Sequence, residues 1–259
     1  MSKKTNHNLT PIVVIPARMA SQRLPGKPLA DIGGVPMIVH VMQRALAANV
    51  GPVVVACAET EIYEAVRAGG GTAIMTDPDL PSGTDRVRAA ADTVDPGKNY
   101  NCVINVQGDL PTLDPLAVSA AVDVLVEVPE CDISTLVVAT EDPREIADPN
   151  VVKAVLSMET DSRGRALYFT RAAAPFGAGA IWHHVGIYAY RRDALGRFCA
   201  LPPSPLELRE KLEQLRALEA GMRIDAAAID SEPHGVDTPE DLARARGIIL
   251  GQEKTGKRS

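Results

Sequence analysis

Aromatic residues are scarce in this chain of 259 residues, where they make up only 3% of the sequence. Single-stranded nucleic acid is usually bound on aromatic rings that stack with its bases, so we expect no such surface here. Positive charge is not in excess either, because 27 Lys and Arg residues are outnumbered by 33 Asp and Glu residues and the formal net charge is -6. No general positive field attracts nucleic acid or an anionic membrane. We therefore expect neither of them as a partner.

Cysteine is also rare, and the four copies are Cys57, Cys102, Cys131 and Cys199. They form no C-x-x-C pair and lie in apolar stretches, which argues against a zinc site or a disulfide framework and predicts reduced, buried thiols. The first ten residues contain no apolar segment of a secretory leader, and no apolar run approaches the length of a membrane span. These absences predict a cytoplasmic protein.

Hydrophobic residues make up 46% of the chain, and with so few aromatics the core must consist of Val, Ile, Leu and Ala. In the first half, short apolar runs alternate with amphipathic segments. The runs expected to be strands are Ile12–Ile15, Val53–Ala56, Thr72–Met75 and Cys102–Val106. The segments expected to be helices are Met37–Ala48, Glu61–Ala68, Thr84–Ala91 and Pro115–Leu125. This alternation predicts an α/β fold with a doubly wound, mostly parallel sheet and a ligand at the carboxyl ends of its strands.

The pattern changes after about residue 130, and we expect an antiparallel subdomain over residues 131–200 that covers one end of the sheet. Its expected strands, separated by loops and not by helices, are Asp132–Ala139, Val151–Met158, Arg165–Phe169 and His184–Tyr190. A long helix is predicted from Ser204 to about Glu219 and a last one from Pro239 to about Leu250, each opened by a capping box with Pro at the first helical position. We expect one domain over residues 1–250, followed by a polar tail over 251–259.

A basic loop follows the first strand and carries Arg18, Arg23 and Lys27. Such a loop can wrap a triphosphate, because two guanidinium groups and an ammonium group neutralise its charge. It is not a Walker A loop, since Pro28 stands where that motif needs Ser or Thr, and no G-x-G-x-x-G motif supports a dinucleotide site. The alternative is a solvated surface turn whose basic residues are incidental.

Two aspartates are placed where they could hold a metal ion. Asp109 follows a buried strand, and Asp237 lies directly before Thr238, which can cap the last helix and leave the Asp237 carboxylate available. Mg²⁺ characteristically takes one or two carboxylates together with phosphate oxygens. The alternatives are an Asx-turn at Asp109 and a favourable charge near a helix N-terminus at Asp237.

Further polar residues could contact a ligand. Ser82 and Arg86 lie where a loop enters a helix, although a capped helix with a surface Arg explains them equally well. Gln107 lies two residues before Asp109 and is expected on the same side of the chain. His184 and Tyr188 share a face of a predicted strand, and a core pair is the alternative.

On the predicted helix from Ser204, three residues form an i, i+3, i+7 stripe, namely Glu207, Glu210 and Gln214. The capping box alone explains Glu207. Glu213 lies beside this stripe, and Glu213 and Gln214 both offer the acceptor atoms that ligand hydroxyl groups need.

Several motifs, taken together and in order, resemble the 3-deoxy-manno-octulosonate (Kdo) cytidylyltransferases. They are IPARMASQRLPGKPLADIGGVPMIVHV, PSGTDRV, NVQGDL, HVGIYAYR, SPLELREKLEQLRA and GVDTPEDLA. The resemblance extends from Ile12 to about Arg246. It implies a nucleotidyltransferase of the nucleotide-diphospho-sugar transferase fold that transfers CMP from CTP to the anomeric hydroxyl of Kdo, with release of pyrophosphate, for lipopolysaccharide biosynthesis.

The resemblance also implies roles for the candidate residues. The expected CTP-binding residues are Arg18, Arg23, Lys27 and Ser82, with Ser82 near the cytosine. The expected Kdo-binding residues are Arg86, Gln107, His184, Tyr188, Glu213 and Gln214. Asp109 and Asp237 are expected to ligate a catalytic Mg²⁺, with Arg18 and Lys27 as their catalytic companions. A homodimer is expected as the assembly.

The sequence departs from the family pattern at two places. Leu110 stands where the family usually has an acidic residue before Pro, which removes a candidate for a second metal ligand. The segment from Arg171 to Gly177 replaces a bulkier one, so a cover over the sugar is expected to differ. Two rival interpretations stay open: the same reaction on 8-amino Kdo or a sialic acid, and a nucleotide-binding regulator without catalysis. The retained Lys27, Asp109 and Asp237 argue against the regulator.

Overall fold

The computed structural model describes residues 9–20 and 23–251, and its contacts divide the chain into two compact units. The β4 unit comprises Ile12–Gly97, Asn105–Val118 and the chain from Pro233 onward, and the β10 unit comprises Lys98–Ile104, Ser119–Glu232 and the chain up to Pro11. The single domain expected over residues 1–250 stays a prediction. Most of the expected polar tail, residues 252–259, lies outside the described residues.

Parallel strands form the centre of the β4 unit. They are β1 (Pro11–Ala17), β4 (Val53–Cys57) and β5 (Thr72–Met75), which pair in the order β5-β4-β1. Every residue of β4 is buried, as expected for a parallel strand covered on both faces. These elements confirm the strands predicted in the first half of the chain.

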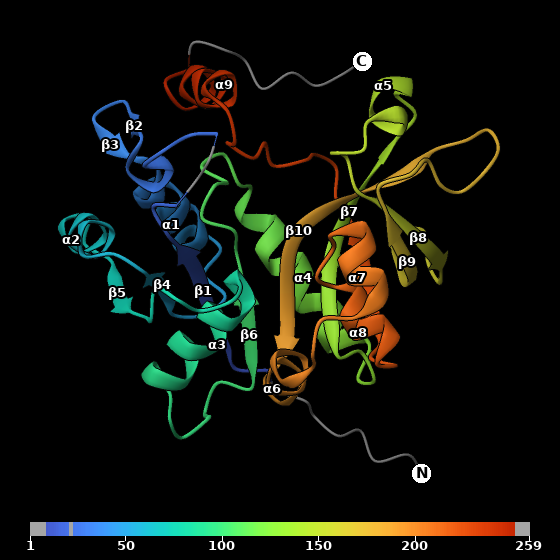
Figure 1. Cartoon of the computed structure of the whole chain (residues 1–259), viewed down its shortest axis with the longest axis horizontal. Coiled ribbons are helices and arrows are strands. Elements are labelled where there is room, and N and C mark those ends of the chain that lie inside the picture. The colour runs from blue at the N-terminus through green and yellow to red at the C-terminus, as the bar shows by residue number, and fades with distance from the viewer. Residues whose placement is uncertain (1–8, 21–22, 252–259) are drawn as a thin grey trace. The chain divides into compact units, whose positions relative to one another are not determined.

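Helices α1 (Met37–Ala47), α2 (Thr60–Ala68) and α3 (Gly83–Val94) lie against these strands (Figure 1) and begin and end close to the predicted residues. The last helix, α9 (Pro239–Ile249), also begins and ends as predicted and lies against β2 (Asp31–Ile32), which follows the 3₁₀ turn η1 (Lys27–Leu29) and forms a short hairpin with β3 (Val35–Pro36). Gly33 and Gly34 both have positive φ, 65° and 84°, which is the geometry of a two-residue hairpin turn. The predicted α/β alternation is thus confirmed.

Three elements carry residues of both units: β1, through Pro11, β6 (Cys102–Asn105) and α4 (Pro115–Glu127). Directly after β6, the backbone N–H of Val106 donates to the carbonyl oxygen of Val14 at 3.2 Å. This bond lies within the β4 unit and keeps the chain after β6 alongside β1.

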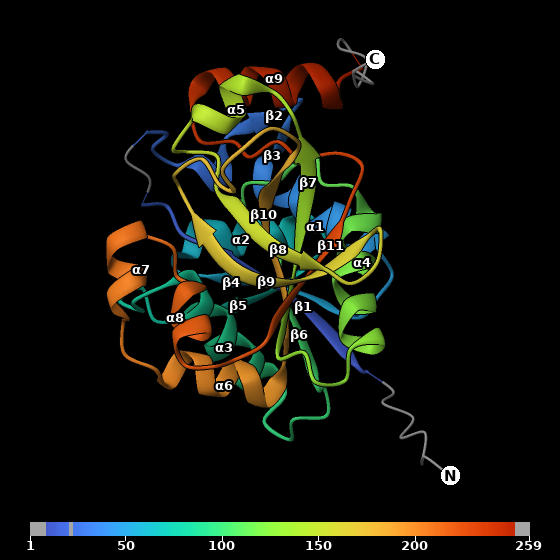
Figure 2. The same cartoon turned by 90° about the vertical axis from the view of Figure 1, so that its right-hand side faces the viewer.

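The β10 unit contains a mixed sheet, in which β10 (Ile181–Arg191) pairs with β7 (Ile133–Thr140). The order continues through β11 (Ile224–Ala228), β9 (Arg163–Thr170) and β8 (Lys153–Met158). Only β11 and β7 are parallel among these neighbouring pairs of described strands. Because β8 also pairs with β10, the order closes into a ring (Figure 2). The antiparallel character expected for residues 131–200 is confirmed, and β11 extends it.

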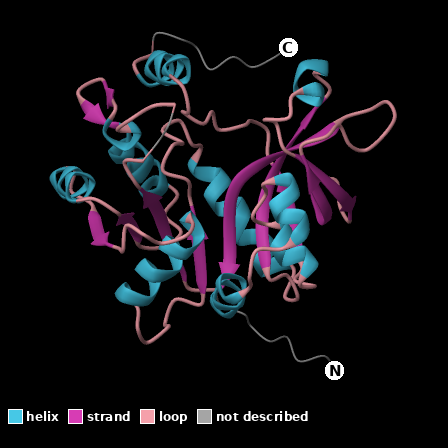
Figure 3. Ribbon diagram, viewed as in Figure 1, coloured by secondary structure: helices cyan, strands magenta, loops and turns pink. Residues whose placement is uncertain are grey.

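Four helices accompany this sheet (Figure 3): α5 (Pro143–Ala147), α6 (Arg192–Ala200), α7 (Pro205–Glu210) and α8 (Leu215–Glu219). The expectation of loops alone between the strands was wrong at α5, a short helix capped by Asp142. The long helix expected from Ser204 to Glu219 was also wrong. Lys211 takes the left-handed conformation, φ 57° and ψ 47°, and ends α7. Leu212 and Leu215, which follow the break, are both buried. The free energy gained by burying them offsets the cost of the left-handed conformation at Lys211.

The four cysteines are free. Three of them are buried as predicted, and Cys199 is only partly buried. Among the described residues, no helix has the length and apolar character needed to cross a bilayer.

Candidate functional site

The turn that carries Asp109 lies unusually close to β1. A Cβ atom on Gly108 would lie 2.7 Å from the carbonyl oxygen of Pro16, so the residue at this position must lack a side chain. Beyond the turn, the backbone N–H of Val236 donates to the carbonyl oxygen of Asp109 at 2.9 Å. These contacts bring the end of β1, the Asp109 turn and the chain before α9 together in the β4 unit.

The start of α9 places Asp237 at the same point. Thr238 Oγ1 accepts from the backbone N–H of Asp241, and the Asp241 carboxylate accepts from the N–H of Thr238 at 3.0 Å, which confirms the predicted capping box. Capping is therefore done by Thr238 and Asp241. The Asp237 carboxylate is left to interact with side chains.

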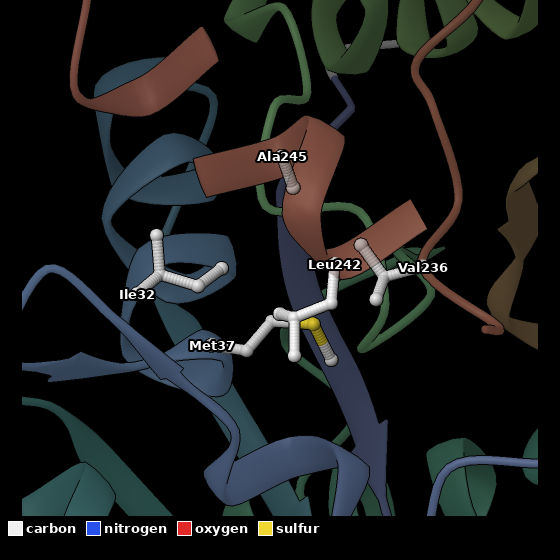
Figure 4. Packing of buried hydrophobic residues seen from close by; sticks show 5 residues of the cluster. All are labelled: Ile32, Met37, Val236, Leu242 and Ala245. Carbon is white, nitrogen blue, oxygen red and sulfur yellow. The ribbon is translucent and has the colours of Figure 1, made fainter. Parts of the chain in front are cut away.

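An apolar cluster anchors this segment (Figure 4). Its buried members come from β2, α1, the chain before α9 and α9 itself, and they are Ile32, Met37, Val236, Leu242 and Ala245. Val236 is fully buried, and its neighbour Asp237 is partly exposed, with 46% of its side chain accessible. The cluster thus fixes the backbone from which the Asp237 carboxylate projects.

Lys27 joins the two aspartates. Its Nζ atom lies 2.8 Å from Asp109 Oδ2 and 3.0 Å from Asp237 Oδ1. Burial alone would lower the pKa of Lys27, but the two carboxylates outweigh it and hold this pKa above its ordinary value. Asp237 also pairs with Arg23, whose Nη2 lies 2.8 Å from Oδ2. The site therefore holds a charged ammonium group between two carboxylates at neutral pH.

These residues line a cleft of about 860 Å³ within the β4 unit. Eight residues predicted from the sequence line it: Arg18, Arg23, Lys27, Ser82, Arg86, Gln107, Asp109 and Asp237. The side chains of Arg18, Arg23 and Lys27 thus place the basic loop along this cleft. The two carboxylates of the cleft can hold a divalent metal ion, because they offer hard oxygen ligands. The three cations of the loop can bind a polyphosphate.

Ser82 is the N-cap of α3. Its Oγ accepts from the backbone N–H of Asp85 at 3.1 Å and donates to the Asp85 carboxylate at 2.8 Å. The capped-helix alternative is therefore correct, and Ser82 still lines the cleft together with Gly83.

Arg86 is buried, with an exposed fraction of 2%, so the surface Arg considered as an alternative was wrong. Its guanidinium group donates to Thr76 Oγ1 at 2.6 Å and to the carbonyl oxygens of Asp77 and Pro78 at 2.9 and 3.2 Å. These bonds fix the segment that leads from β5 toward α3.

Gln107 and Asp109 both line the cleft, as their spacing predicted. The Gln107 side-chain amide donates to Asn105 Oδ1 at 3.1 Å, which orients its carbonyl oxygen. Glu59 has no signal in the sequence, yet its carboxylate accepts from the backbone N–H of Met19 at 2.9 Å and so holds the chain directly after Arg18.

In the β10 unit, the rings of His184 and Tyr188 lie 5.5 Å apart. The pairing register of β10 with β7 shifts between Val185 and Tyr188, which interrupts the alternation of side chains along β10. The two rings nevertheless lie next to each other. His184 Nε2 lies 2.9 Å from Thr135 Oγ1, and burial, aided by His183, lowers the pKa of His184 to about 3. His184 is therefore neutral at ordinary pH. Burial and the charge of Glu213 raise the pKa of Tyr188.

The stripe expected on one helix is divided by the break after α7. Glu207 Oε2 pairs with Arg216 Nε at 2.9 Å and also accepts from the N–H of Ser204, as the capping box requires. Glu210 accepts from Thr170 at 2.8 Å. These two glutamates are engaged within the unit.

Glu213 and Gln214 lie at the break, directly before α8. Gln214 is 6% exposed, and its amide nitrogen finds no hydrogen-bond partner among the described residues. A buried amide without a partner is costly, so this group is suited to meet a ligand.

Known proteins resemble this chain over most of its length. The cytidylyltransferase family model matches residues 12–224. A 3-deoxy-manno-octulosonate cytidylyltransferase of Parvibaculum lavamentivorans is 62% identical over 239 residues, which cover 92% of each chain. The chain belongs to this family. A relative of the same description from Rhodospirillum rubrum is 60% identical and covers 92% of this chain and 95% of its own.

Solved structures of cytidylyltransferases also resemble the chain. A CMP:2-keto-3-deoxy-manno-octonic acid synthetase complexed with CTP is 40% identical, with a TM-score of 0.86, and covers 94% of this chain and all of its own. A cytidylyltransferase from Leptospira borgpetersenii is 17% identical, with a TM-score of 0.61 and 95% and 89% coverage, and supports the fold alone. The nucleotide-diphospho-sugar transferase fold expected from the sequence is confirmed.

Proposed function

We propose that this member of the cytidylyltransferase family transfers CMP from CTP to the anomeric hydroxyl of Kdo and releases pyrophosphate. The observation that carries the proposal is the convergence of Lys27, Asp109 and Asp237 in one cleft beside the basic loop. A relative complexed with CTP, 40% identical over nearly the full chain, supports the choice of nucleotide.

The basic loop provides the charge for the triphosphate. Arg18, Arg23 and Lys27 all line the cleft, and together they can neutralise the phosphate oxygens and the charge that develops on the departing pyrophosphate. Ser82 and Gly83 form the wall of the cleft at the start of α3, where we place the cytosine. The hydroxyl of Kdo would attack the α-phosphorus in line with the leaving pyrophosphate, and the chain's main contribution would be positioning and electrostatic stabilisation.

Mg²⁺ is the cofactor that suits this site, because Asp109 and Asp237 offer hard carboxylate oxygens that already share one cation, the Lys27 ammonium group. Asp109 and Asp237 would hold it. When bound, Mg²⁺ would supply Lewis-acid stabilisation of phosphate charge. Leu110 is buried and offers no ligand of its own, so we place no second metal ion there.

For the sugar we propose four polar and aromatic groups of the β10 unit, His184, Tyr188, Glu213 and Gln214. Gln107 and Arg86, which line the cleft of the β4 unit, are separate candidates for contacts with the sugar. The buried amide of Gln214 supports this choice, since a sugar hydroxyl or carboxylate would accept its hydrogen bond. Arg86 is already engaged with residues 76–78, so we expect it to act mainly by holding that segment in place.

We propose that the protein works in the cytoplasm, where CTP is available, and that its product enters lipopolysaccharide biosynthesis. We also propose a homodimer. Two large apolar side chains of the β10 unit support an interface on that unit: Leu167 is 56% exposed and Phe176 is fully exposed.

The choice of sugar can be tested by measuring pyrophosphate release with CTP and Mg²⁺ against Kdo, 8-amino Kdo and a sialic acid. We expect Kdo to give the highest kcat/KM and CMP-Kdo as the product. A higher kcat/KM with a sialic acid would contradict the proposal. Release with no sugar would do so as well, since it would indicate simple hydrolysis of CTP.

A further inference from the structure

A group of side chains of the types that ligate metal ions lies in the β10 unit. It consists of Glu145 from α5, His183 from β10 and Glu232 from the chain after β11, and its ligand atoms all lie within 4.8 Å of one another. Figure 1 shows α5 just beyond the end of β7. His183 and His184 are consecutive on β10 and so point to opposite faces, which separates this group from the pair formed by His184 and Tyr188.

His183 is the buried member of the group. It is only 9% exposed, and its Nδ1 atom has no hydrogen-bond partner among the described residues. This atom nevertheless lies 3.3 Å from Glu232 Oε2 and 3.5 Å from Glu145 Oε2. His183 Nδ1 thus lies near two carboxylates but forms a hydrogen bond with neither. A buried polar atom normally has such a partner.

The two separations from His183 Nδ1 are those of atoms that share a metal ion. Bonds from zinc to imidazole nitrogen and carboxylate oxygen are about 2.0–2.2 Å long, so neighbouring ligands of a tetrahedral ion lie about 3.3–3.5 Å apart. Both distances from His183 Nδ1 agree with this spacing. A direct ion pair of a protonated His183 with either Glu would instead place the atoms at about 2.7–2.9 Å.

We propose that Glu145, His183 and Glu232 form a site for a divalent transition-metal ion, represented by Zn²⁺. One imidazole nitrogen and two carboxylate oxygens are suitable zinc ligands, and the fourth position would take water. The ion would join α5, β10 and the chain after β11, so its binding stabilises the β10 unit. Asp109 and Asp237 offer oxygen alone, which suits Mg²⁺ better.

The test uses the full-length chain, stripped with a chelator and dialysed against Zn²⁺ in the presence of excess Mg²⁺, followed by measurement of zinc per chain. We expect one retained zinc ion in the unaltered protein. His183→Gln and Glu232→Gln should each weaken zinc binding at least tenfold. Glu232 lies half-buried in a loop, so this second variant is expected to fold even where the buried His183→Gln does not.

Matched controls remove similar groups outside the site. Glu141 and His234 are exposed, and Glu141→Gln and His234→Gln should bind zinc as the unaltered protein does. Asp109→Asn should also retain the ion. Zinc should raise the unfolding temperature of the control variants but not that of Glu232→Gln. Equal retention by Glu232→Gln, no retention by the unaltered chain, or loss in Asp109→Asn alone would each overturn the proposal.

Discussion

Lys27 Nζ lies 3.0 Å from Asp237 Oδ1, although the two residues are 210 positions apart in the chain. The ion pair joins the basic loop after β1 to the segment that opens α9. Asp109 completes the arrangement from the turn after β6. The Lys27 ammonium group neutralises both carboxylates and is also assigned to the phosphates of CTP. A change at Lys27, Asp109 or Asp237 should therefore alter the electrostatic environment of the other two residues.

Replacing Asp237 or Asp109 by Asn should abolish most Mg²⁺-dependent turnover, because each change removes a proposed metal ligand. Their side chains are 46% and 28% exposed, so the fold should remain intact. The measurement is initial pyrophosphate release at saturating Mg²⁺, with circular dichroism as the control for folding. Near-normal turnover of Asp237→Asn would show that the metal assignment is wrong.

Lys27→Ala should lower kcat/KM for CTP by roughly a hundredfold, which corresponds to about 2.7 kcal/mol of transition-state stabilisation. The affinity for Kdo should fall much less, since Lys27 is assigned to the phosphates. Arg44→Ala, which removes an exposed cation from α1, is the matched control and should have no effect. Equal losses for both substrates would indicate a collapsed loop and not a lost phosphate contact.

The sequence predicted the parts of the β4 unit well because local signals determine them. Aliphatic runs predicted β1 and β4, and the Thr-Pro-Glu-Asp capping box predicted the start of α9. The features that the sequence did not predict depend on contacts between residues distant in the chain. Lys211 ends α7 in a conformation that only the packing of the following Leu212 explains, and the three bonds of Arg86 to residues 76–78 have no sequence signature.

The turn after β6 offers a test of packing at the cleft. Gly108→Ala should destabilise the protein by about 1–3 kcal/mol, because the new methyl group would be forced against the carbonyl oxygen of Pro16 at 2.7 Å. Gly235→Ala is the control, since the nearest atom to its added Cβ lies 4.0 Å away. Urea unfolding measures both changes. Similar stability of the two variants would show that the turn can move away from β1.

Glu207 should make stability depend on acid pH. Burial alone would raise the pKa of Glu207, but the hydrogen bonds from Arg216 and Ser204 outweigh it and lower this pKa below its ordinary value. The stabilisation is therefore present above the unfolded value of about 4.3 and is lost as the pH falls through the folded pKa. Glu207→Gln should cost about 1–3 kcal/mol at pH 7 and progressively less below pH of about 4. A constant difference in the free energy of unfolding from pH 7 to pH 3 would contradict this account.

Nucleotide choice tests the central claim most directly. A pocket bounded by the Ser82-Gly83 turn should admit cytosine and exclude purines by size. It should also disfavour uracil, because the acceptor that bonds the cytosine amino group would be left without a partner. An unpaired buried polar group costs about 1–3 kcal/mol, so CTP should be preferred over UTP by roughly tenfold to a hundredfold. The measurement is initial pyrophosphate release with each nucleoside triphosphate at equal, subsaturating concentration and saturating Kdo. We predict turnover with CTP and none with ATP or GTP, whereas a purine triphosphate that matched CTP would contradict the assignment of a cytidylyltransferase site.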